Sequence, residues 1–168
     1  SFEDAPIPEI TPTQVLIQVY ATSFNPLDYL LVRGGLKDRA PLEFPFTLCS
    51  DVSGVITKMG SAVSGFKKGD RVFGFLDYTK NGAAAEYVAT EAAYLAPAPR
   101  SIPLEEAASV PLAALTAWQG LFEHINLQRG QRVLINNASG GVGNYAVQLA
   151  KWKGASGWKG ACGDSWVD

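Results

Sequence analysis

The sequence is poor in residues that build metal centres and disulfide frameworks. Its 168 residues include two cysteines, Cys49 and Cys162, and one histidine, His124. These three residues cannot fill a four-ligand zinc site without help from carboxylates, so we predict neither zinc nor another bound metal. The low cysteine count argues against a disulfide-stabilised secreted domain and is typical of a reducing compartment. We therefore expect a cytoplasmic location.

A dominant charge and a long apolar run are also missing. The 14 lysines and arginines are interspersed with 16 aspartates and glutamates, for a net charge of -2. This balance disfavours a nucleic-acid partner. No apolar run reaches the length that a membrane span requires. Residues 1–12 are acidic and rich in proline, so we expect them not to be a signal peptide.

The first hundred residues have the pattern of an all-β domain. Val15, Ile17 and Val19 alternate with their neighbours, which is typical of a half-buried strand. Similar short runs predict strands over residues 14–19, 52–59, 71–74, 84–88 and 93–96. Glycines and prolines separate these runs, so we expect a small barrel or sandwich.

After Pro103 the pattern changes to alternating helix and strand. We predict helices over residues 104–109, 112–124 and 142–153 and a strand over residues 132–136. The strand has three consecutive apolar residues between turn signals, which is typical of a strand buried on both faces of a parallel sheet. The change of pattern places a domain boundary between residues 97 and 112, and we predict domains over residues 1–111 and 112–168.

A glycine-rich turn joins the predicted strand to the last predicted helix. It consists of Ala138, Ser139, Gly140, Gly141, Val142 and Gly143. In a dinucleotide-binding fold, such a turn lets a pyrophosphate approach the backbone, and the amides and dipole at the helix start bind its charge. Gly140 and Gly143 fit the second and third glycines of that pattern, and Ala138 replaces the first. The alternative is a tight turn needed only for packing.

Several ordered segments of the chain resemble one known family. They are ATSFNPLD at 21–28, DVSGV at 51–55, GDRVFG at 69–74, GAAAEYV at 82–88, VPLAALTAWQGL at 110–121 and VLINNASGGVGNYAVQLAK at 133–151. Together they resemble the zinc-free quinone oxidoreductase branch of the medium-chain dehydrogenase/reductase superfamily. The resemblance implies a mixed β and α/β fold, in which a GroES-like β-barrel catalytic domain precedes the start of a Rossmann nucleotide-binding domain.

The resemblance also implies roles for individual residues. Zinc-dependent relatives have a cysteine in place of Asn25 and a histidine in place of Ser50, so it implies a site without zinc. Asn25 would lie near the nicotinamide, or would only be a turn residue before Pro26. Tyr29 would donate a proton to the substrate, or would only be a packed aromatic side chain. Thr116 would lie near the nicotinamide ring, or would bond only to its own helix backbone.

Other positions are expected to be structural. We interpret Asp28 and Arg33 as a polar pair or as solvated charges. Cys49 replaces a glycine that is usual in the family, and we expect a small buried residue rather than a reactive thiol.

Taken together, the resemblance implies an NADP(H)-dependent, zinc-independent oxidoreductase that transfers hydride to a quinone or an α,β-unsaturated carbonyl. A proton would come from solvent or a nearby hydroxyl. Two alternatives stay open: a truncated, non-catalytic binding or interaction module, and an enoyl thioester reductase. The resemblance makes NADP(H) the preferred cofactor over NAD(H). Asp164 lies 21 residues after Gly143, where an acid would favour NAD, but no basic partner can be identified there.

The length of the chain also departs from what the resemblance implies, because members of the family run to about twice this length and contain two domains. Residues 156–168 resemble a second Rossmann strand only loosely, and one parallel strand with one helix cannot cover its own apolar faces. We therefore expect a truncated gene product, part of a longer protein, or an isoform with an altered reading frame. Such a chain should bind cofactor weakly and turn over little. A homodimer would be one way to cover the apolar faces.

Overall fold

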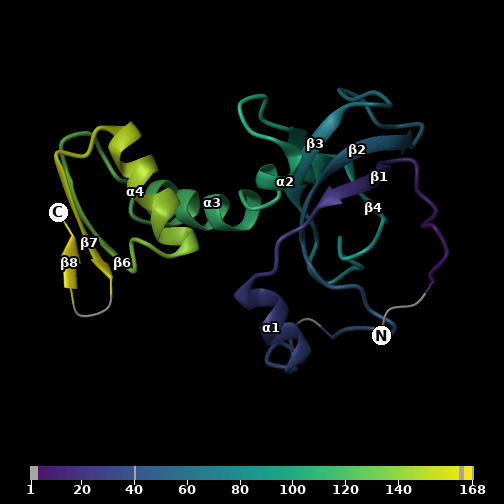
Figure 1. Ribbon diagram of the computed structural model, residues 1–168, viewed down its shortest axis with the longest axis horizontal. Helices are drawn as coiled ribbons and strands as arrows, with labels where there is room; N and C mark the ends of the chain where they lie inside the picture. The colour runs from purple at the N-terminus through teal and green to yellow at the C-terminus, as the bar shows by residue number, and fades with distance from the viewer. Residues whose placement is uncertain (1–3, 40, 163–164, 168) are drawn as a thin grey trace. The chain divides into compact units, whose positions relative to one another are not determined.

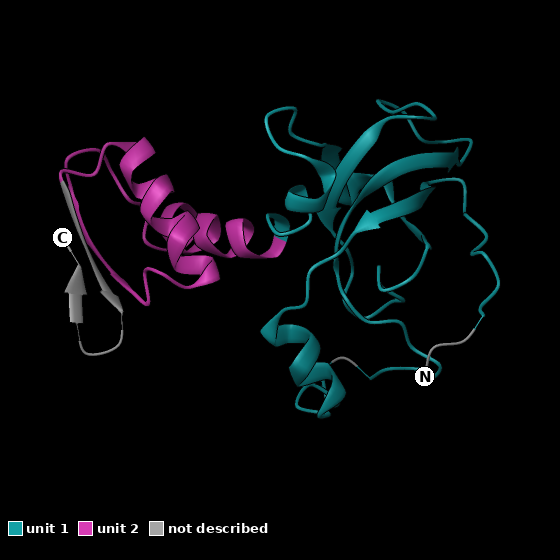
Figure 2. Ribbon diagram, in the orientation of Figure 1, with its two compact units in different colours: residues 1–111 teal, residues 112–168 magenta. Residues whose placement is uncertain are grey.

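The chain divides into two compact units. The structure, a computed structural model, describes residues 4–39, 41–162 and 165–167, with the backbone alone for 157–162 and 165–167. Unit 1 is Ser1–Pro111 and unit 2 is Leu112–Asp168 (Figure 1, Figure 2). Within the described residues, no helix combines the length and the apolar character needed to cross a bilayer. The two units are described separately below.

Unit 1 is built on a five-stranded antiparallel sheet with the strand order β4-β1-β2-β3-β5. The strands are β1 (Gln14–Ala21), β2 (Asp51–Met59), β3 (Arg71–Phe75), β4 (Tyr87–Glu91) and β5 (Leu95–Pro97). Ile17 of β1 lies opposite Ile56 of β2 on one side and opposite Val88 of β4 on the other. Two register shifts interrupt the pairing of β1 with β2. Irregularities of this kind bend a strand and increase the local twist of a sheet.

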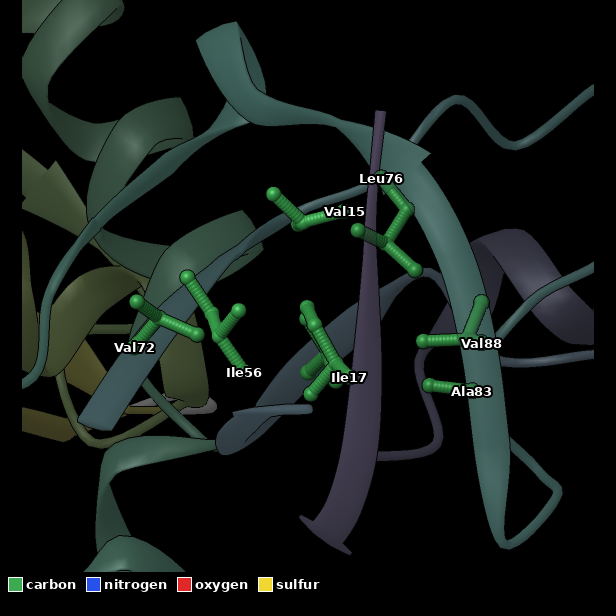
Figure 3. Packing of buried hydrophobic residues seen from close by; sticks show 8 residues of the cluster. Val15, Ile17, Ile56, Val72, Leu76, Ala83 and Val88 are labelled. Carbon is green, nitrogen blue, oxygen red and sulfur yellow. The ribbon is translucent and has the colours of Figure 1, made fainter. Parts of the chain in front are cut away.

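The core of unit 1 collects the inward-facing residues of these strands. Val15, Ile17, Val52, Ile56 and Val72 are all completely buried, and Figure 3 shows side chains of this cluster packed between the strands. The predicted burial of Val15 and Ile17 is confirmed, whereas Leu16, expected on the other face of the strand, is also buried. A β-branched residue fits the pleated surface of a sheet, so these positions combine strand preference with burial.

Helix α1 (Pro26–Val32) was not predicted from the sequence. Pro26 occupies its first turn, where a missing N–H removes no helical hydrogen bond. Asn25 is the N-cap and forms a capping box with Asp28. The helix has only 7 residues. Its periodic pattern is therefore too short to detect, although its capping signals are present in the sequence.

Two strand predictions in unit 1 were wrong in their bounds. The strand expected over residues 84–88 is β4 at Tyr87–Glu91, because the amides of Ala83 and Ala84 bond to the carbonyls of Cys49 and Leu48 instead of a sheet neighbour. The strand expected over residues 93–96 is a 3₁₀ turn, η1 (Ala92–Tyr94), followed by β5. The helix expected over residues 104–109 is the shorter α2 (Leu104–Ala107).

Unit 2 begins with helix α3 (Pro111–Trp118), whose first residue closes unit 1. The helix expected over residues 112–124 is confirmed in its extent, and its second half is a π-helical segment, η2 (Gln119–His124), that the pattern did not predict. Strand β6 (Arg132–Asn136) and helix α4 (Gly141–Lys153) agree with the predicted strand and helix. Gly154 ends α4 with φ 84°, a left-handed conformation that glycine adopts readily.

The sheet of unit 2 has the order β6-β7-β8. Strand β7 (Gly157–Cys162) pairs with β6 in parallel, from Arg132 opposite Gly157 to Asn136 opposite Ala161. Strand β8 (Ser165–Val167) pairs with β7 in antiparallel orientation. The expectation of a single parallel strand was therefore wrong, because the backbone of the loosely matching segment does form a second one. Two glycines within β7, Gly157 and Gly160, weaken the strand signal of this segment in the sequence.

Candidate functional site

The glycine-rich turn of unit 2 lies between β6 and α4. Asn137, directly after β6, has φ 54°, a left-handed conformation that asparagine tolerates better than most residues. Its carbonyl accepts a hydrogen bond of 2.9 Å from the amide of Gly140. This contact closes the turn, and α4 begins at the next residue. The structure thus brings the six predicted residues 138–143 together in one strand-to-helix turn.

The three glycines of this turn have different surroundings. A Cβ atom on Gly143 would lie 2.1 Å from the carbonyl oxygen of Asn137 and 2.7 Å from the Cα of Ala138. A Cβ on Gly140 would lie 2.5 Å from the side-chain nitrogen of Asn137. In contrast, a Cβ on Gly141 would meet no atom within 4 Å. Gly143 and Gly140 therefore permit the close packing of helix and turn, and Gly141 leaves its backbone open.

The start of α4 is suited to an anion. The first amides of a helix have no intrahelical acceptor, and the helix dipole places partial positive charge there. The N-cap residue Gly140 provides no side-chain cap, and the first turn of this 13-residue helix contains no acidic residue. Ser139, Gly141 and Val142 are exposed, whereas Ala138 is half-buried against the apolar cluster of unit 2. The arrangement can bind a phosphate group through backbone amides.

A second candidate site lies in unit 1 around Asn25. The side-chain nitrogen of Asn25 donates to Oδ2 of Asp51 at 2.9 Å and to Oγ of Ser23 at 3.0 Å. Asp51 is completely buried at the start of β2, and Asn25 is half-buried. Sequence reasoning missed Asp51 and Ser23 as site residues. The available signal was a carboxylate at the head of a strand whose next five residues, 52–56, are apolar or small.

Asp28 anchors the same segment from the first turn of α1. It is 1% exposed, and its carboxylate accepts from the amide of Asn25 at 2.7 Å and from the amide of Cys49 at 2.9 Å. Asp28 thus has a structural role, with backbone amides as its partners. Arg33, the other half of the expected pair, lies over the ring of Tyr29 at 4.2 Å.

Cys49 is buried, as expected, and has φ 70°. This left-handed conformation explains physically why a glycine suits the position in the family. Burial raises the pKa of the Cys49 thiol, and the charges of Asp28 and Asp51 raise it as well, while a hydrogen bond with Thr22 lowers it. A thiol of this kind stays protonated and is a poor nucleophile.

The two remaining predicted residues are both exposed. Tyr29 is 46% exposed on α1, and its backbone amide approaches the carbonyl of Asn25 at 3.4 Å. Thr116, in α3 of unit 2, donates its hydroxyl to the carbonyl of Leu112 at 2.7 Å. That bond is the local alternative considered for Thr116 in the sequence, and a hydroxyl can still accept a second partner. The roles of both residues stay predictions.

The metal prediction concerns Asn25 and Ser50, which stand where zinc-dependent relatives have ligands. The amide nitrogen of Asn25 donates a hydrogen bond to the carboxylate of Asp51, and Ser50 is 5% exposed. In the part of the chain that the structure describes, no group of three or more histidine, cysteine, aspartate or glutamate side chains could hold a metal ion. A zinc-independent reaction stays a prediction.

A curved antiparallel β unit and a strand–glycine turn–helix unit on one chain define a dehydrogenase-like class of protein. Residues 11–100 match the alcohol dehydrogenase GroES-like domain family. The chain belongs to the medium-chain dehydrogenase/reductase superfamily, and the family and fold class predicted from the sequence are confirmed.

Individual relatives support the same assignment. The chain is 39% identical over 150 residues to a quinone-oxidoreductase homolog from Spinacia oleracea, covering 86% of this chain and 46% of that protein. It is 40% identical over 152 residues to a 2-methylene-furan-3-one reductase from Solanum lycopersicum, covering 86% and 38%. A crystal structure of an alcohol dehydrogenase superfamily protein from Novosphingobium aromaticivorans matches with a TM-score of 0.88, 35% identity and coverage of 96% and 49%. The chain thus spans about half the length of its relatives or less.

Proposed function

We propose that the protein is an NADPH-dependent, zinc-independent oxidoreductase that transfers hydride to a quinone or to an α,β-unsaturated carbonyl compound. The observation that carries the proposal is the open backbone at Gly141, at the start of a helix that packs tightly on its turn through Gly143. The names of two relatives, a quinone-oxidoreductase homolog and a 2-methylene-furan-3-one reductase, support the substrate class. In this proposal unit 1 is the catalytic domain and unit 2 is the beginning of a Rossmann nucleotide-binding domain.

The residues of unit 2 would hold the pyrophosphate of the cofactor. The fit is supported by the open surroundings of Gly141 and by the absence of an acidic residue in the first turn of α4. A phosphate oxygen there would accept hydrogen bonds from amides of residues 141–143 without displacing a side chain. Thr116 would contribute its hydroxyl near the nicotinamide ring. The bound nicotinamide supplies the hydride, and the protein orients it.

The residues of unit 1 would orient the reacting groups. Asn25 would hydrogen-bond to the nicotinamide or the substrate, from a position that Asp51 and Asp28 fix. Tyr29 carries an exposed phenol that could donate a proton to the reduced substrate. The proposed preference for NADPH over NADH rests on the family resemblance alone. Asp164, the residue whose acid would favour NADH, lies outside the described residues. The cytoplasmic location and a homodimer also stay proposals.

A titration of backbone amide signals tests this proposal on the chain itself. We expect NADPH, NADH and inorganic pyrophosphate each to shift the 1H–15N signals of residues 139–143 and to leave most of unit 1 unaffected. Replacing Gly141→Glu should abolish these shifts, because the new carboxylate repels the phosphates. The same carboxylate should stabilise α4 by about 0.5 kcal/mol through the helix dipole. Binding and stability would thus change in opposite directions.

The matched control is Gly120→Ala, which also fills an open glycine position in unit 2 but lies in η2, away from the turn. This variant should bind like the parent chain. If millimolar cofactor leaves residues 139–143 unshifted in the parent chain, the proposed function loses the observation that carries it. Cofactor oxidation with a 1,4-benzoquinone or an enone as acceptor then tests the chemistry.

The alternative of a non-catalytic interaction module is favoured by a different observation. Leu134 of β6 is 55% exposed, and among the described strands β6 lies at one end of its sheet. An apolar strand at a sheet edge can pair with another chain. Concentration-dependent association without nucleotide binding would favour this module. An enoyl thioester reductase would share the chemistry of the main proposal and would differ in reducing acyl thioesters in preference to quinones.

A further inference from the structure

Three polar side chains from one short segment of unit 1 converge on a single residue of β2. The hydroxyl of Thr22 donates to the backbone carbonyl of Asp51 at 2.6 Å. The hydroxyl of Ser23 donates to Oδ2 of Asp51 at 2.5 Å, and the amide nitrogen of Asn25 donates to the same oxygen at 2.9 Å. The segment that leads into α1 is therefore fastened to the head of β2 through its side chains.

The chemistry of a buried carboxylate fixes the direction of these bonds. Asp51 is completely buried, and an ionised carboxylate can only accept hydrogen bonds. Removing such a charge from water is unfavourable unless donors replace the lost water. Ser23 and Asn25 are two such donors. Because Oδ2 of Asp51 accepts this bond, the nitrogen of the Asn25 amide faces it, and the amide group has one defined orientation.

This orientation determines what Asn25 can offer to a ligand. Its amide nitrogen carries two N–H groups. This nitrogen lies 2.9 Å from Oδ2 of Asp51 and 3.0 Å from Oγ of Ser23, whose own proton goes to Asp51. The backbone carbonyl of Ser23 is a third acceptor, at 3.5 Å. The amide oxygen takes part in the capping box of α1, but it has two lone pairs. Because the nitrogen faces these three acceptors, the amide oxygen is the group that Asn25 can offer to a ligand.

We propose that Asp51 is a positioning residue that, together with Ser23, fixes Asn25 so that its amide oxygen serves as a hydrogen-bond acceptor for the cofactor or substrate. The proposal rests on the proposed function, in which Asn25 contacts the nicotinamide. Its chemical consequence is a preference for a ligand with an N–H or O–H group at this point. The carboxamide of a nicotinamide has such a group.

The first measurement uses the chain without any ligand. The side-chain NH₂ signals of Asn25 should exchange with water slowly, and Asp51→Asn should speed that exchange by about tenfold, since a bond to a charged acceptor is stronger than one to a neutral acceptor. Ser23→Ala should give a smaller acceleration and provides the readout if Asp51→Asn fails to fold. The matched control is Ser53→Ala, which removes another buried hydroxyl of β2 that bonds to the carbonyl of Leu104. It should leave the Asn25 signals unchanged.

The second measurement compares NADPH with adenosine 2′-phosphate 5′-diphosphoribose, which lacks the nicotinamide. Asp51→Asn should weaken NADPH binding about tenfold and leave binding of the nicotinamide-free ligand unchanged, because the replacement alters the Asn25 site and not the glycine turn at residues 138–143. The double replacement Asn25→Asp with Asp51→Asn exchanges donor and acceptor, and it should restore NADPH affinity to within about threefold. A purely structural role of Asp51 would instead weaken both ligands equally.

The outcomes separate this proposal from the proposed function. Unchanged exchange of the Asn25 signals in Asp51→Asn or Ser23→Ala would overturn the positioning role, whatever the chain binds. Equal loss of both ligands would also overturn it. Failure of the parent chain to bind either ligand would instead overturn the proposed function, while the exchange measurement would still decide whether Asp51 holds Asn25.

Discussion

The two units of this chain bury their apolar residues to different degrees. In unit 1, Val15, Ile17, Val52, Ile56 and Val72 are all completely buried inside one antiparallel sheet. In unit 2, the buried cluster consists of three alanines, two leucines and one isoleucine: Ala117, Leu121, Leu127, Ile135, Ala146 and Ala150. Large apolar side chains lie at the surface of both units, among them Phe44 of unit 1 and, in unit 2, Leu134 at 55% and Trp152 at 70% exposure. The β unit therefore has the more complete core.

The difference follows from the type of sheet. A curved antiparallel sheet can bury one face against itself and expose the other to water, so it needs no covering layer. A parallel sheet requires helices on both faces, and helix α4 packs against β6 on the face that contains Ile135. Leu134 points to the opposite face. In the same unit the rings of Trp118 and Phe122 meet edge to face, with centroids 4.7 Å apart. The ring of Trp152 lies 6.1 Å from Trp118 and 6.2 Å from Phe122, so the aromatic residues partly cover one another.

The comparison predicts that the largest loss of stability follows from a replacement in the core of unit 1. Replacing Ile56→Ala should lower the free energy of unfolding by about 3 kcal/mol, through lost burial and the cavity that remains. The matched change in unit 2, Leu134→Ala, should alter it by less than about 0.5 kcal/mol, because that side chain already contacts water. Urea unfolding followed separately through the amide signals of each unit measures both values. Similar losses of stability for the two variants would show that the units do not differ in how completely they bury these side chains.

A loss of stability of intermediate size is expected at the glycine turn of unit 2, where Gly143 lies against the backbone of Asn137. Gly143→Ala should destabilise unit 2 by about 2 kcal/mol, because the added carbon collides with the Asn137 carbonyl. Gly141→Ala, two residues away, should raise stability by about 0.5 kcal/mol, since it meets no atom and reduces the freedom of the unfolded chain. Thermal unfolding of the pair measures the difference. Equal midpoints would contradict the distinction between a packing glycine and an open one.

The smallest effect concerns the thiol of Cys49 in unit 1. Its pKa is raised in the folded state, so folding favours the protonated thiol. This contribution to stability is complete below the pKa of the unfolded chain and is lost as the pH rises through the higher folded value. In a Cys162→Ser background, iodoacetamide should modify the native chain slowly at neutral pH and faster in urea. Equal rates in the two conditions would mean that Cys49 is accessible in the native chain.

Local features of the fold were predictable because they depend on neighbouring residues. The alternation around Ile17 and the apolar run at residues 133–135 placed β1 and β6 correctly. The glycine turn was predictable for the same reason, since its closing hydrogen bond joins Asn137 to Gly140, three residues apart. Helix α1 was missed although Pro26 and Asp28 are good start signals, because seven residues contain too little periodicity. The π-helical end of the helix over residues 112–124 has no signal of its own in the pattern.

The contacts that organise the Asn25 site could not be predicted from the pattern. Asp51 lies 28 residues after Ser23 and 26 after Asn25, and Cys49 lies 21 residues after its partner Asp28. The family resemblance predicted Asn25 as a site residue, but it did not point to Asp51, the carboxylate to which Asn25 donates a hydrogen bond. The strand bounds near residues 84–88 failed for a related reason, since the amides of Ala83 and Ala84 bond to residues more than thirty positions earlier.

The sequence alone determined the two patterns of secondary structure, the glycine turn with its exposed amides, and the membership of the superfamily. These features arise from side-chain alternation and from backbone preferences that act over a few residues. The tertiary structure decided which polar groups form hydrogen bonds. The carboxylate of Asp51 accepts from the side chains of Ser23 and Asn25, and the carboxylate of Asp28 accepts from the backbone amide of Cys49. A buried carboxylate requires hydrogen-bond donors, and these donors come from segments that are distant in the sequence. No local pattern of residues therefore predicts which donors they are.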